Sequence, residues 1–455
     1  MDAAEVAVRS ATGTETATPA GRAIPRSPRA PSEPPAQHTD ASGAPVANLH
    51  RAMSRALDRA DWRLVLWDGR AVGSASPQFT ITMRSPAALD RLLGGVPEKA
   101  FGRAYVEGLI NVDPLEPLLE PLAVAPVRQL FLAWPAIVAA LVALGGRPRS
   151  APVLAAEARL RGVRHSRRRD AEAIRHHYDL PPEFYGLILD SQLTYSCAYF
   201  ETPADDLDRA QASKLELICR KLRLQAGESL LDIGCGWGSL VIHAAEHHGV
   251  RAVGITLSPA QVKEGRRRVR ERGLEDRVEI RLADYRDDVG VYDAVASIGM
   301  VEHVGRAKLG VYSDAVYRSV RPGGRALIHG ITQRPTRVWN RASFNDAFVF
   351  PDGELEDIGL MVRAYERAGF EVRDVESLRD HYEMTLRRWA QRLQTNWDEA
   401  VRIGGEQRAL VWRLYLAGAA VSFRVGTLAI HQTLAVRPDE QGRVDIPLTR
   451  RDWYS

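Results

Sequence analysis

The sequence predicts a doubly wound α/β domain with a mostly parallel sheet, preceded by a small mixed α+β domain. Two observations predict the larger domain. Strand and helix patterns alternate from Gly227 onward, and a glycine-rich turn directly follows the first of these strands. The smaller domain is predicted by short strand-like stretches and a capped helix pattern before residue 125. A chain of 455 residues has room for two domains and a tail.

The N-terminal third supplies the evidence for domain boundaries. Its first residues are rich in Ala, Pro, Ser and Thr, a composition typical of a disordered tail. Residues 61–69 and 79–86 then alternate like strands, and residues 85–95 read as a helix that ends at glycine. The predicted parts are a tail (1–46), a small domain (47–125), a connector (126–170) and the large domain (171–455).

The connector contains an apolar segment and a basic segment. Residues 129–146 carry no charge, but they are short for a membrane span and contain Pro135. A buried helix is the simpler interpretation, and a helix lying on a bilayer surface is the alternative. The arginine-rich run 159–179 fits either a solvated helix face or contact with anionic lipid headgroups.

Composition narrows the class of protein. A hydrophobic content of 45% and a charged content of 26% are typical of a globular chain. The net charge of +4 mildly favours an anionic partner surface and does not require nucleic acid. The 3 cysteines suggest no disulfide framework and lack the spacing of a zinc site, so we predict no metal and a reducing compartment. No signal-peptide core is visible, so a cytoplasmic location is expected.

The large domain alternates strands and helices in a regular order. One helix begins at Ser258, a predicted N-cap that is followed by Pro259 at the first helical position. This alternation predicts a parallel sheet with helices on both faces. The predicted strands are 228–234, 250–256, 277–284, 292–299 and 325–332, and the predicted helices are 238–248, 258–273 and 309–320, the last ending at the turn 321–324.

The glycine-rich turn "LLDIGCGWGSL", residues 230–240, predicts a ligand site. Gly234 and Gly236 let the backbone bend tightly and approach a ligand. The turn lacks the Gly-Lys-Ser/Thr of a phosphate-binding loop. Asp232 precedes the glycines, which is unfavourable beside pyrophosphate and acceptable beside a cation. S-adenosylmethionine (SAM), with its ammonium and sulfonium groups, fits that charge better.

The ends of the next two strands supply further cofactor candidates. The second strand end, "GITLSPAQ", lacks the acid that usually holds a ribose diol. Thr256 or Gln261 is expected to bind the ribose instead. After the third strand, Asp284 and Tyr285 are candidates for contact with adenine. In this order within one α/β unit, the motifs predict a Rossmann-like SAM-dependent methyltransferase fold.

Six motifs between residues 176 and 389 resemble those of one family in order. They are "HHYDLPPEFYGLILDSQLTYSCAYF", "LLDIGCGWGSL", "GITLSPAQ", "GMVEHVG", "LIHGIT" and "LRDHYEMTLRRW". The chain resembles the cyclopropane fatty acid and cyclopropane mycolic acid synthases, in particular the cyclopropane-fatty-acyl-phospholipid synthases. The preceding domain is similar to the small N-terminal domain of full-length bacterial members.

The resemblance implies a reaction and its site. Such an enzyme transfers the SAM methyl group to the cis double bond of an unsaturated acyl chain, and proton loss then closes a cyclopropane ring. The family is understood to hold a bicarbonate ion as the base. The implied ion ligands are the side chains of Glu302, His329 and Tyr382 with the backbones near Cys197 and Ile331, and Tyr195 and Ser196 are implied beside the cofactor.

Cys197 lies among aromatic residues in "TYSCAYF", which by itself suggests a nucleophile. The resemblance instead makes it a structural part of the ion site, since no step needs a covalent adduct. Taken singly, Glu302 also fits a local pair and His329 also fits a core histidine. Their joint match to one family gives them a predicted role.

Several alternatives remain open at this stage. Residues 345–359 lack the family's basic residue and add Glu354, Glu356 and Asp357, so the acceptor is less determined than the cofactor. Methyl-branched or methylene products, N-methylation of a small molecule, and lipid binding by an inactive fold are the other interpretations. A nucleic-acid methyltransferase fits poorly, because no Asn/Asp-Pro-Pro-Tyr signature is present. We expect a peripheral contact with phospholipid at the inner face of the cell membrane, and a homodimer is left open.

Overall fold

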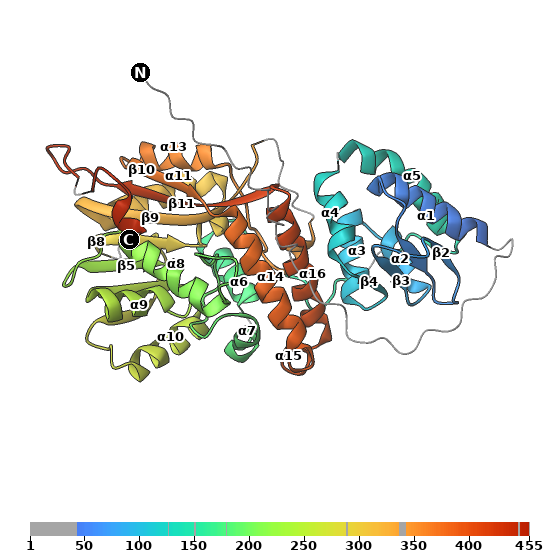
Figure 1. Cartoon of the computed structure of the whole chain (residues 1–455), viewed down its shortest axis with the longest axis horizontal. Coiled ribbons are helices and arrows are strands. Elements are labelled where there is room, and N and C mark those ends of the chain that lie inside the picture. Colours follow the sequence, from blue (N-terminus) through green and yellow to red (C-terminus); the bar gives the residue numbers. More distant parts are fainter. Residues whose placement is uncertain are drawn as a thin grey trace, which may run out of the picture.

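The computed structural model describes residues 43–454 apart from 126, 150–151, 179, 288–289, 336–342 and 445. Figure 1 shows a small N-terminal domain beside a larger α/β domain, with two long C-terminal helices between them. The expected tail, residues 1–46, lies mostly outside the described residues. Its last three residues belong to a helix, because the first helix already begins at Ala44.

The small domain is a four-stranded sheet covered by helices. Its strand order is β2-β1-β3-β4, and β1 runs parallel to β3 while the other pairs are antiparallel. Trp62, Phe79 and Tyr105 are fully buried in its core. The predicted strands and helix of this region are confirmed. Its elements are α1 (Ala44–Leu57), β1 (Arg63–Val65), β2 (Ala71–Gly73), β3 (Thr80–Met83), α2 (Ala87–Leu93), α3 (Pro97–Val106), β4 (Ile110–Asp113) and α4 (Glu116–Val124).

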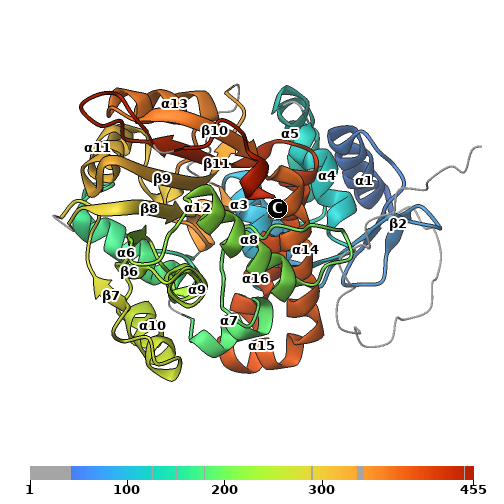
Figure 2. The same cartoon turned by 60° about the vertical axis from the view of Figure 1, so that its left-hand side comes forward.

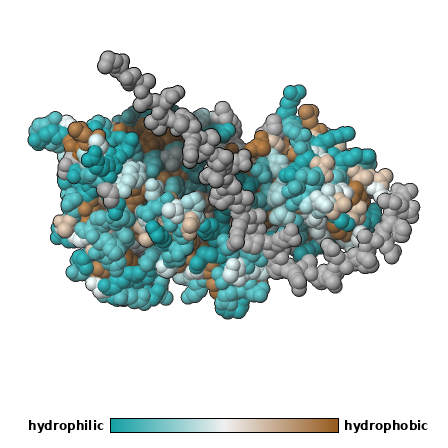
Figure 3. Space-filling model, in the orientation of Figure 1, coloured by the Kyte–Doolittle hydropathy of each residue, from teal (hydrophilic) through white to brown (hydrophobic). Residues whose placement is uncertain are grey.

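The apolar connector segment forms helix α5 (Val127–Ala143), with Pro135 inside it. Its C-terminal part buries Ala140 and Leu141, but Phe131 is 80% exposed and Leu132 is 70% exposed. The prediction of a buried helix is therefore wrong for its N-terminal half. Among the described helices, none combines the length and apolarity that a membrane crossing requires. In the space-filling view, apolar residues interrupt a mostly hydrophilic surface over the small domain (Figure 3).

The large domain is built on a seven-stranded sheet of order β10-β11-β9-β8-β5-β6-β7. Strands β5 to β9 run parallel to one another, and β11 pairs antiparallel with both β9 and β10. The predicted doubly wound fold is confirmed. The strands are β5 (Ser229–Ile233), β6 (Arg251–Thr256), β7 (Val278–Leu282), β8 (Tyr292–Ile298), β9 (Val320–Gln333), β10 (Glu371–Ser377) and β11 (Leu428–Val436).

Helices cover both faces of this sheet (Figure 2). Residues of α8, α9 and α10 form one apolar layer, and residues of α11 and α13 form the other. The helices are α6 (Arg167–His177), α7 (Pro182–Ile188), α8 (Leu207–Lys221), α9 (Ser239–His248), α10 (Pro259–Glu271), α11 (Leu309–Ser319), α12 (Phe344–Phe348), α13 (Ile358–Arg367), α14 (Arg379–Thr395), α15 (Trp397–Gly404) and α16 (Glu406–Arg424), with 3-10 turns at Val301–His303, Arg306–Lys308 and Arg451–Trp453.

Local signals explain most of the confirmed boundaries. Ser258 caps α10 as predicted, since its side chain accepts a hydrogen bond from the Gln261 amide. Strand β5 is central and parallel, so Leu230 and Leu231 on its two faces are both fully buried. Strand β9 differs from the prediction because it includes residues 321–324, which were expected to form a turn. The ladder to β8 shifts register before Ala294, so the segment enters the sheet through an irregularity.

The small domain packs on α14 and α16. The Arg387 guanidinium binds both oxygens of the buried Glu116 carboxylate, at 3.0 and 2.9 Å. Arg424 of α16 reaches the same carboxylate at 3.2 Å. Phe344 of α12 lies against Gly102 of α3, where any side chain at residue 102 would clash with its ring. The same long helix α14 carries Tyr382, so this packing also positions a predicted site residue.

Candidate active site

The glycine-rich turn joins β5 to α9 at the carboxyl edge of the parallel strands. Gly234 and Gly236 have φ angles of +84° and +55°, which favour glycine. The amides of Gly234 and Cys235 both donate to the Ile255 carbonyl, at 2.9 and 3.0 Å. The turn is thus fixed against β6, and its backbone borders the position where doubly wound folds bind ligands.

The two predicted ribose ligands lie together at the end of β6. The Thr256 hydroxyl donates to Gln261 Oε1 at 2.6 Å, and both residues are buried. Thr256 also accepts from the Ser258 amide at 3.2 Å. The cap of α10 therefore holds this pair beside the glycine-rich turn.

The predicted adenine contacts follow β7. The Tyr285 ring meets Tyr312 edge-on at 5.5 Å, and the Arg286 guanidinium lies over it at 5.2 Å. Arg286 also donates to both oxygens of Asp284, at 2.7 and 2.6 Å. A ligand that reaches Asp284 would have to share those oxygens, so Tyr285 is the better-placed member of the predicted pair.

A buried polar cluster adjoins the end of β5. Within the described part of the chain, Asp232 Oδ1 has no hydrogen-bond partner, and burial raises the pKa of this carboxyl to about 7 against the opposing effect of Lys214. Lys214 Nζ donates to Ser196 Oγ at 2.8 Å, while Gln211 holds the Ser196 carbonyl at 2.9 Å. An unpartnered buried acid beside the glycine-rich turn fits a cationic cofactor such as SAM.

Lys214 and Gln211 were missed by sequence reasoning. Both lie in α8, whose pattern is that of an ordinary amphipathic helix. A lysine on the apolar face was the available signal, because lysines are seldom fully buried without a partner. Their hydrogen bonds hold residues 194–196 in place.

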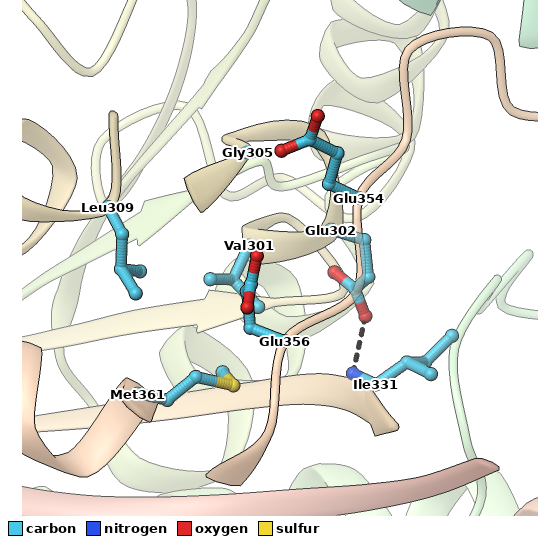
Figure 4. A pocket seen from close by; sticks show the side chains of 8 residues that line it. All are labelled: Val301, Glu302, Gly305, Leu309, Ile331, Glu354, Glu356 and Met361. Atoms are coloured by element: carbon cyan, nitrogen blue, oxygen red, sulfur yellow. Dashed lines mark hydrogen bonds between the residues drawn. The ribbon is translucent and has the colours of Figure 1, made fainter. Parts of the chain in front are cut away.

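Glu302 lies in the short turn after β8, with its carboxylate buried. Oε1 accepts from the Ile331 amide at 2.7 Å, as Figure 4 shows, and Oε2 has no partner among the described residues. Burial raises the pKa of Glu302 to about 7. A small pocket adjoins this side chain; it is lined by Val301, Glu302, Gly305, Leu309, Ile331, Glu354, Glu356 and Met361.

Replacing Glu302 with Gln is expected to change how stability depends on pH. The pKa of Glu302 is raised from 4.5 to about 7 in the fold, so its protonated form contributes stability that is lost as pH rises through 7. Glutamine does not ionise, so the variant does not lose this stability as pH rises. The melting temperature of Glu302→Gln relative to the parent chain should therefore rise from about pH 4.5 to about pH 7 and then level off. A difference that stays flat over this range in thermal melts would contradict a raised pKa.

Tyr382 and Cys197 meet where α14 begins. Tyr382 is buried against Phe423 and Trp389, with ring centroids 4.7 and 6.0 Å away. Burial, together with Tyr415, Cys197 and Glu302, raises the pKa of its hydroxyl well above the usual value. Tyr382 thus lies within electrostatic reach of both Cys197 and Glu302.

Cys197 has the environment of a structural residue. It is fully buried, and its thiol donates to the Ala198 carbonyl at 3.2 Å. Burial raises the pKa of this thiol well above its ordinary value, so the thiolate that a nucleophile needs is disfavoured. This argues against Cys197 as a nucleophile.

His329 lies on β9, two residues before Ile331. It is 1% exposed, and neither ring nitrogen has a hydrogen-bond partner in the described chain. Burial lowers its pKa far below the usual value, with Lys214 adding to the effect, so the ring is neutral. An unpaired buried imidazole is unusual for a core histidine, and it leaves one N–H free for a ligand.

An aromatic wall surrounds Tyr195, and sequence reasoning did not find it. The Tyr195 ring lies 5.2 Å from Trp389 and 5.7 Å from Trp412, and its hydroxyl is 3.5 Å from that of Tyr415. His177 stacks on Phe350 at 4.2 Å. These rings come from widely separated segments, so no local pattern could bring them together. They give the site an apolar lining.

Acidic residues of segment 345–359 pair with arginines of the basic run and with Arg306. Arg169 holds Asp352 through two hydrogen bonds, and Arg164 lies 3.4 Å from Glu354. Arg306 binds Glu356 at 2.6 Å. The basic run is therefore neither a uniformly solvated face nor a free lipid-binding strip, since part of it neutralises the segment that departs from the family pattern.

The fold and the site together define a SAM-dependent methyltransferase. Residues 165–433 match the family model described as mycolic acid cyclopropane synthetase. The chain therefore belongs to that family, and the general resemblance expected from the motifs is confirmed.

Three relatives by sequence illustrate the family. The chain is 40% identical over 399 residues to a probable fatty acid methyltransferase of Pseudomonas putida, covering 86% of this chain and 96% of the relative. It is 34% identical to the tuberculostearic acid methyltransferase UfaA1 of Mycobacterium tuberculosis, covering 92% and 95%. It is 35% identical to the cyclopropane-fatty-acyl-phospholipid synthase of Escherichia coli, covering 58% and 68%.

Solved structures agree with the fold. The crystal structure of the mycolic acid cyclopropane synthase CmaA1 complexed with SAH and CTAB is 32% identical in sequence, with a TM-score of 0.56. The match covers 59% of this chain and 98% of that one. SAM as methyl donor is thereby supported for the family and for this chain.

Proposed function

We propose that this enzyme transfers the methyl group of SAM to the cis double bond of an unsaturated acyl chain of a membrane phospholipid and closes a cyclopropane ring. One observation carries the proposal. Glu302 Oε2 and the ring nitrogens of His329 are buried without partners among the described residues, and Tyr382 lies within electrostatic reach of Glu302. The names of the relatives support a fatty acyl acceptor.

The aromatic wall suits the first step. An unactivated alkene is a weak nucleophile, so alignment with the methyl donor and exclusion of water must supply much of the rate. Bound SAM supplies an electrophilic methyl group on a sulfonium. The rings of Tyr195, Trp389 and Trp412 provide an apolar boundary for the acyl chain, and aromatic faces also favour a nearby cation.

The second step needs a base that water cannot reach. The unpartnered groups fit a small oxyanion with one O–H group, such as bicarbonate, which would supply that base when bound. Neutral His329 offers an N–H, Tyr382 offers an O–H, and Glu302 offers Oε2 as an acceptor. The Ile331 amide contributes through Glu302, because it donates to Oε1 of that carboxylate.

A second product class has an observation in its favour. The match to the tuberculostearic acid methyltransferase covers 92% of this chain, whereas the match to the phospholipid cyclopropane synthase covers 58%. A methyl-branched or methylene product is therefore the alternative outcome for the same cofactor and acceptor. The presence of both Glu302 and His329 favours ring closure.

The deciding experiment analyses the product. The purified chain is incubated with SAM and vesicles of unsaturated phospholipid, and released acyl chains are analysed by mass spectrometry and proton NMR. A gain of one CH2 with upfield ring protons supports cyclopropanation, and the same gain with vinylidene signals supports a methylene product. No mass gain despite measurable SAM binding would overturn the proposed acceptor.

The exposed start of α5 is the proposed contact with the membrane. Phe131 and Leu132 project from this helix at 80% and 70% exposure, and the neighbouring Arg128 is exposed. Apolar side chains beside a basic residue are typical of helices that lie on an anionic bilayer. The paired part of the basic run is a weaker candidate, because its arginines bind acidic groups of this chain.

The double variant Phe131→Glu/Leu132→Glu is expected to lower the affinity for vesicles by about 10-fold or more. Two apolar side chains that would enter the bilayer are replaced by charged ones. Flotation with vesicles of unsaturated anionic phospholipid measures this. Val311→Glu is the matched control, since Val311 is an apolar residue 46% exposed on α11 of the large domain. Equal flotation of the double variant and the parent chain would argue against α5 as the docking element.

A further inference from the structure

Three metal-binding side chains meet where α8 packs on α9, and a carboxylate adjoins two of them. Cys219 comes from α8, and His243 and His248 come from α9; one ligand atom from each lies within 4.8 Å of the others. Glu216, one turn before Cys219, accepts from His243 Nε2 at 3.2 Å and from His248 Nε2 at 3.0 Å through the same oxygen. The thiol and the two imidazoles thus lie together between the two helices, with the carboxylate next to both imidazoles.

We propose that this cluster binds a Zn²⁺ ion, with Cys219, His243, His248 and Glu216 as its ligands. Sulfur, imidazole and carboxylate ligands in a set of four are those that tetrahedral zinc accepts. A thiolate with two imidazoles also disfavours Mg²⁺ and Ca²⁺, which prefer oxygen ligands. The ion joins α8 to α9 and has a structural role.

The geometry needs only a small contraction. Zinc at about 2.0–2.3 Å from each ligand places neighbouring ligand atoms about 3.3–3.8 Å apart, so rotations that bring the atoms of Cys219, His243 and His248 together by roughly 1–1.5 Å suffice. Glu216 is already fixed from the other side, because Arg220 donates to Oε1 at 2.7 Å. Its second oxygen contacts both imidazoles, and binding of an ion would exchange those hydrogen bonds for bonds to the metal.

Access to the site is open from one side. Cys219 is fully buried and forms the inner wall. The side chains of His248 and Glu216 are 18% and 31% exposed, so an ion can enter past them. A closed inner face with a partly open outer face is what a reversible metal site requires.

The cluster is separate from the methyl-transfer site. His248 is the last residue of α9, about 13 Å along the helix axis from Ser239 at 1.5 Å per residue, and Ser239 adjoins the glycine-rich turn. The ion would therefore stabilise the far end of the helix whose start borders the cofactor. The sequence concealed the site, because the strand β5 and the glycine-rich turn separate Cys219 from the histidines.

The test measures metal binding by the full chain. The protein is stripped with a chelator, exchanged into Zn²⁺ or Co²⁺, and freed of loose metal by gel filtration. We expect one Zn²⁺ per chain by elemental analysis, a thiolate-to-cobalt charge-transfer band with Co²⁺, and a melting temperature raised by several degrees with Zn²⁺.

The variants decide the ligands. Cys219→Ser should abolish the charge-transfer band, and His248→Gln, at a partly exposed position, should weaken Zn²⁺ binding at least about 10-fold. His247→Ala is the control, since this exposed histidine neighbours the cluster without belonging to it. Absence of stoichiometric Zn²⁺ in the parent chain, or full Zn²⁺ binding by His248→Gln, would overturn the proposal.

Discussion

Glu302→Gln is expected to lower kcat by about 10²–10⁴-fold, the range typical for loss of a group that acts in proton transfer. The amide cannot serve as the anionic acceptor that Oε2 provides. It still has an oxygen to accept from the Ile331 amide, so the local backbone should keep its arrangement. SAM affinity should change by less than about threefold, because the loss falls on the chemical step. Initial rates on vesicles and a SAM titration measure the two effects.

His329→Ala is the companion variant, with the same expected separation between turnover and SAM binding. Glu356→Gln is the control, because this carboxylate comes from the acidic segment but is paired with Arg306. Near-normal activity of both Glu302→Gln and His329→Ala would show that the ion-site assignment is wrong. An equal loss of SAM affinity in Glu302→Gln would move its role to the cofactor site.

Features set by local chemistry could be predicted from the sequence. Ser258 was recognisable as an N-cap because its hydroxyl and the following Pro259 act within one turn. Gly234 and Gly236 were recognisable because positive φ angles at a strand-to-helix turn favour glycine. Thr256 and Gln261 followed from their position after the second strand, and the structure places them in contact.

Features that join distant segments could not be predicted in this way. The opposite charges of Arg164 and Glu354 offset one another in an ion pair. This pairing explains why extra acids in segment 345–359 are tolerated. The aromatic wall and the pairing of Lys214 with Ser196 depend on how α8, α14 and α16 pack. Sequence periodicity predicts which face of a helix is buried, but it does not give the neighbour that face meets.

The partial burial of helix α5 illustrates the same limit. Its apolar sequence predicted burial, since apolar segments of this length usually belong to a core. The structure buries Ala140 and Leu141 and leaves Phe131 and Leu132 exposed. The pattern alone contains no information on where the covering domain ends, so only the packed structure distinguishes a core helix from one with a free apolar end.

Gly236→Ala is expected to weaken SAM binding by about 10-fold or more. A methyl group at this position meets no described atom within 4 Å, so it fits the protein itself. It would instead project from the glycine-rich turn, where the backbone must approach the cofactor closely. The φ angle of +55° adds a cost of about 1–2 kcal/mol to folding for a residue with a side chain. Isothermal titration with SAM measures the affinity, and thermal melts measure the stability.

Gly273→Ala separates these two effects. Gly273 follows α10, has a φ angle of +62°, and also has no described atom within 4 Å of an added methyl group. The backbone strain of the two variants should therefore be similar, and both should lose comparable stability. Only Gly236→Ala should lose SAM affinity, since only that methyl group occupies the predicted cofactor position. If both variants bind SAM equally, then the glycine-rich turn does not border the cofactor, and the assignment of Gly234, Thr256 and Gln261 would fall with it.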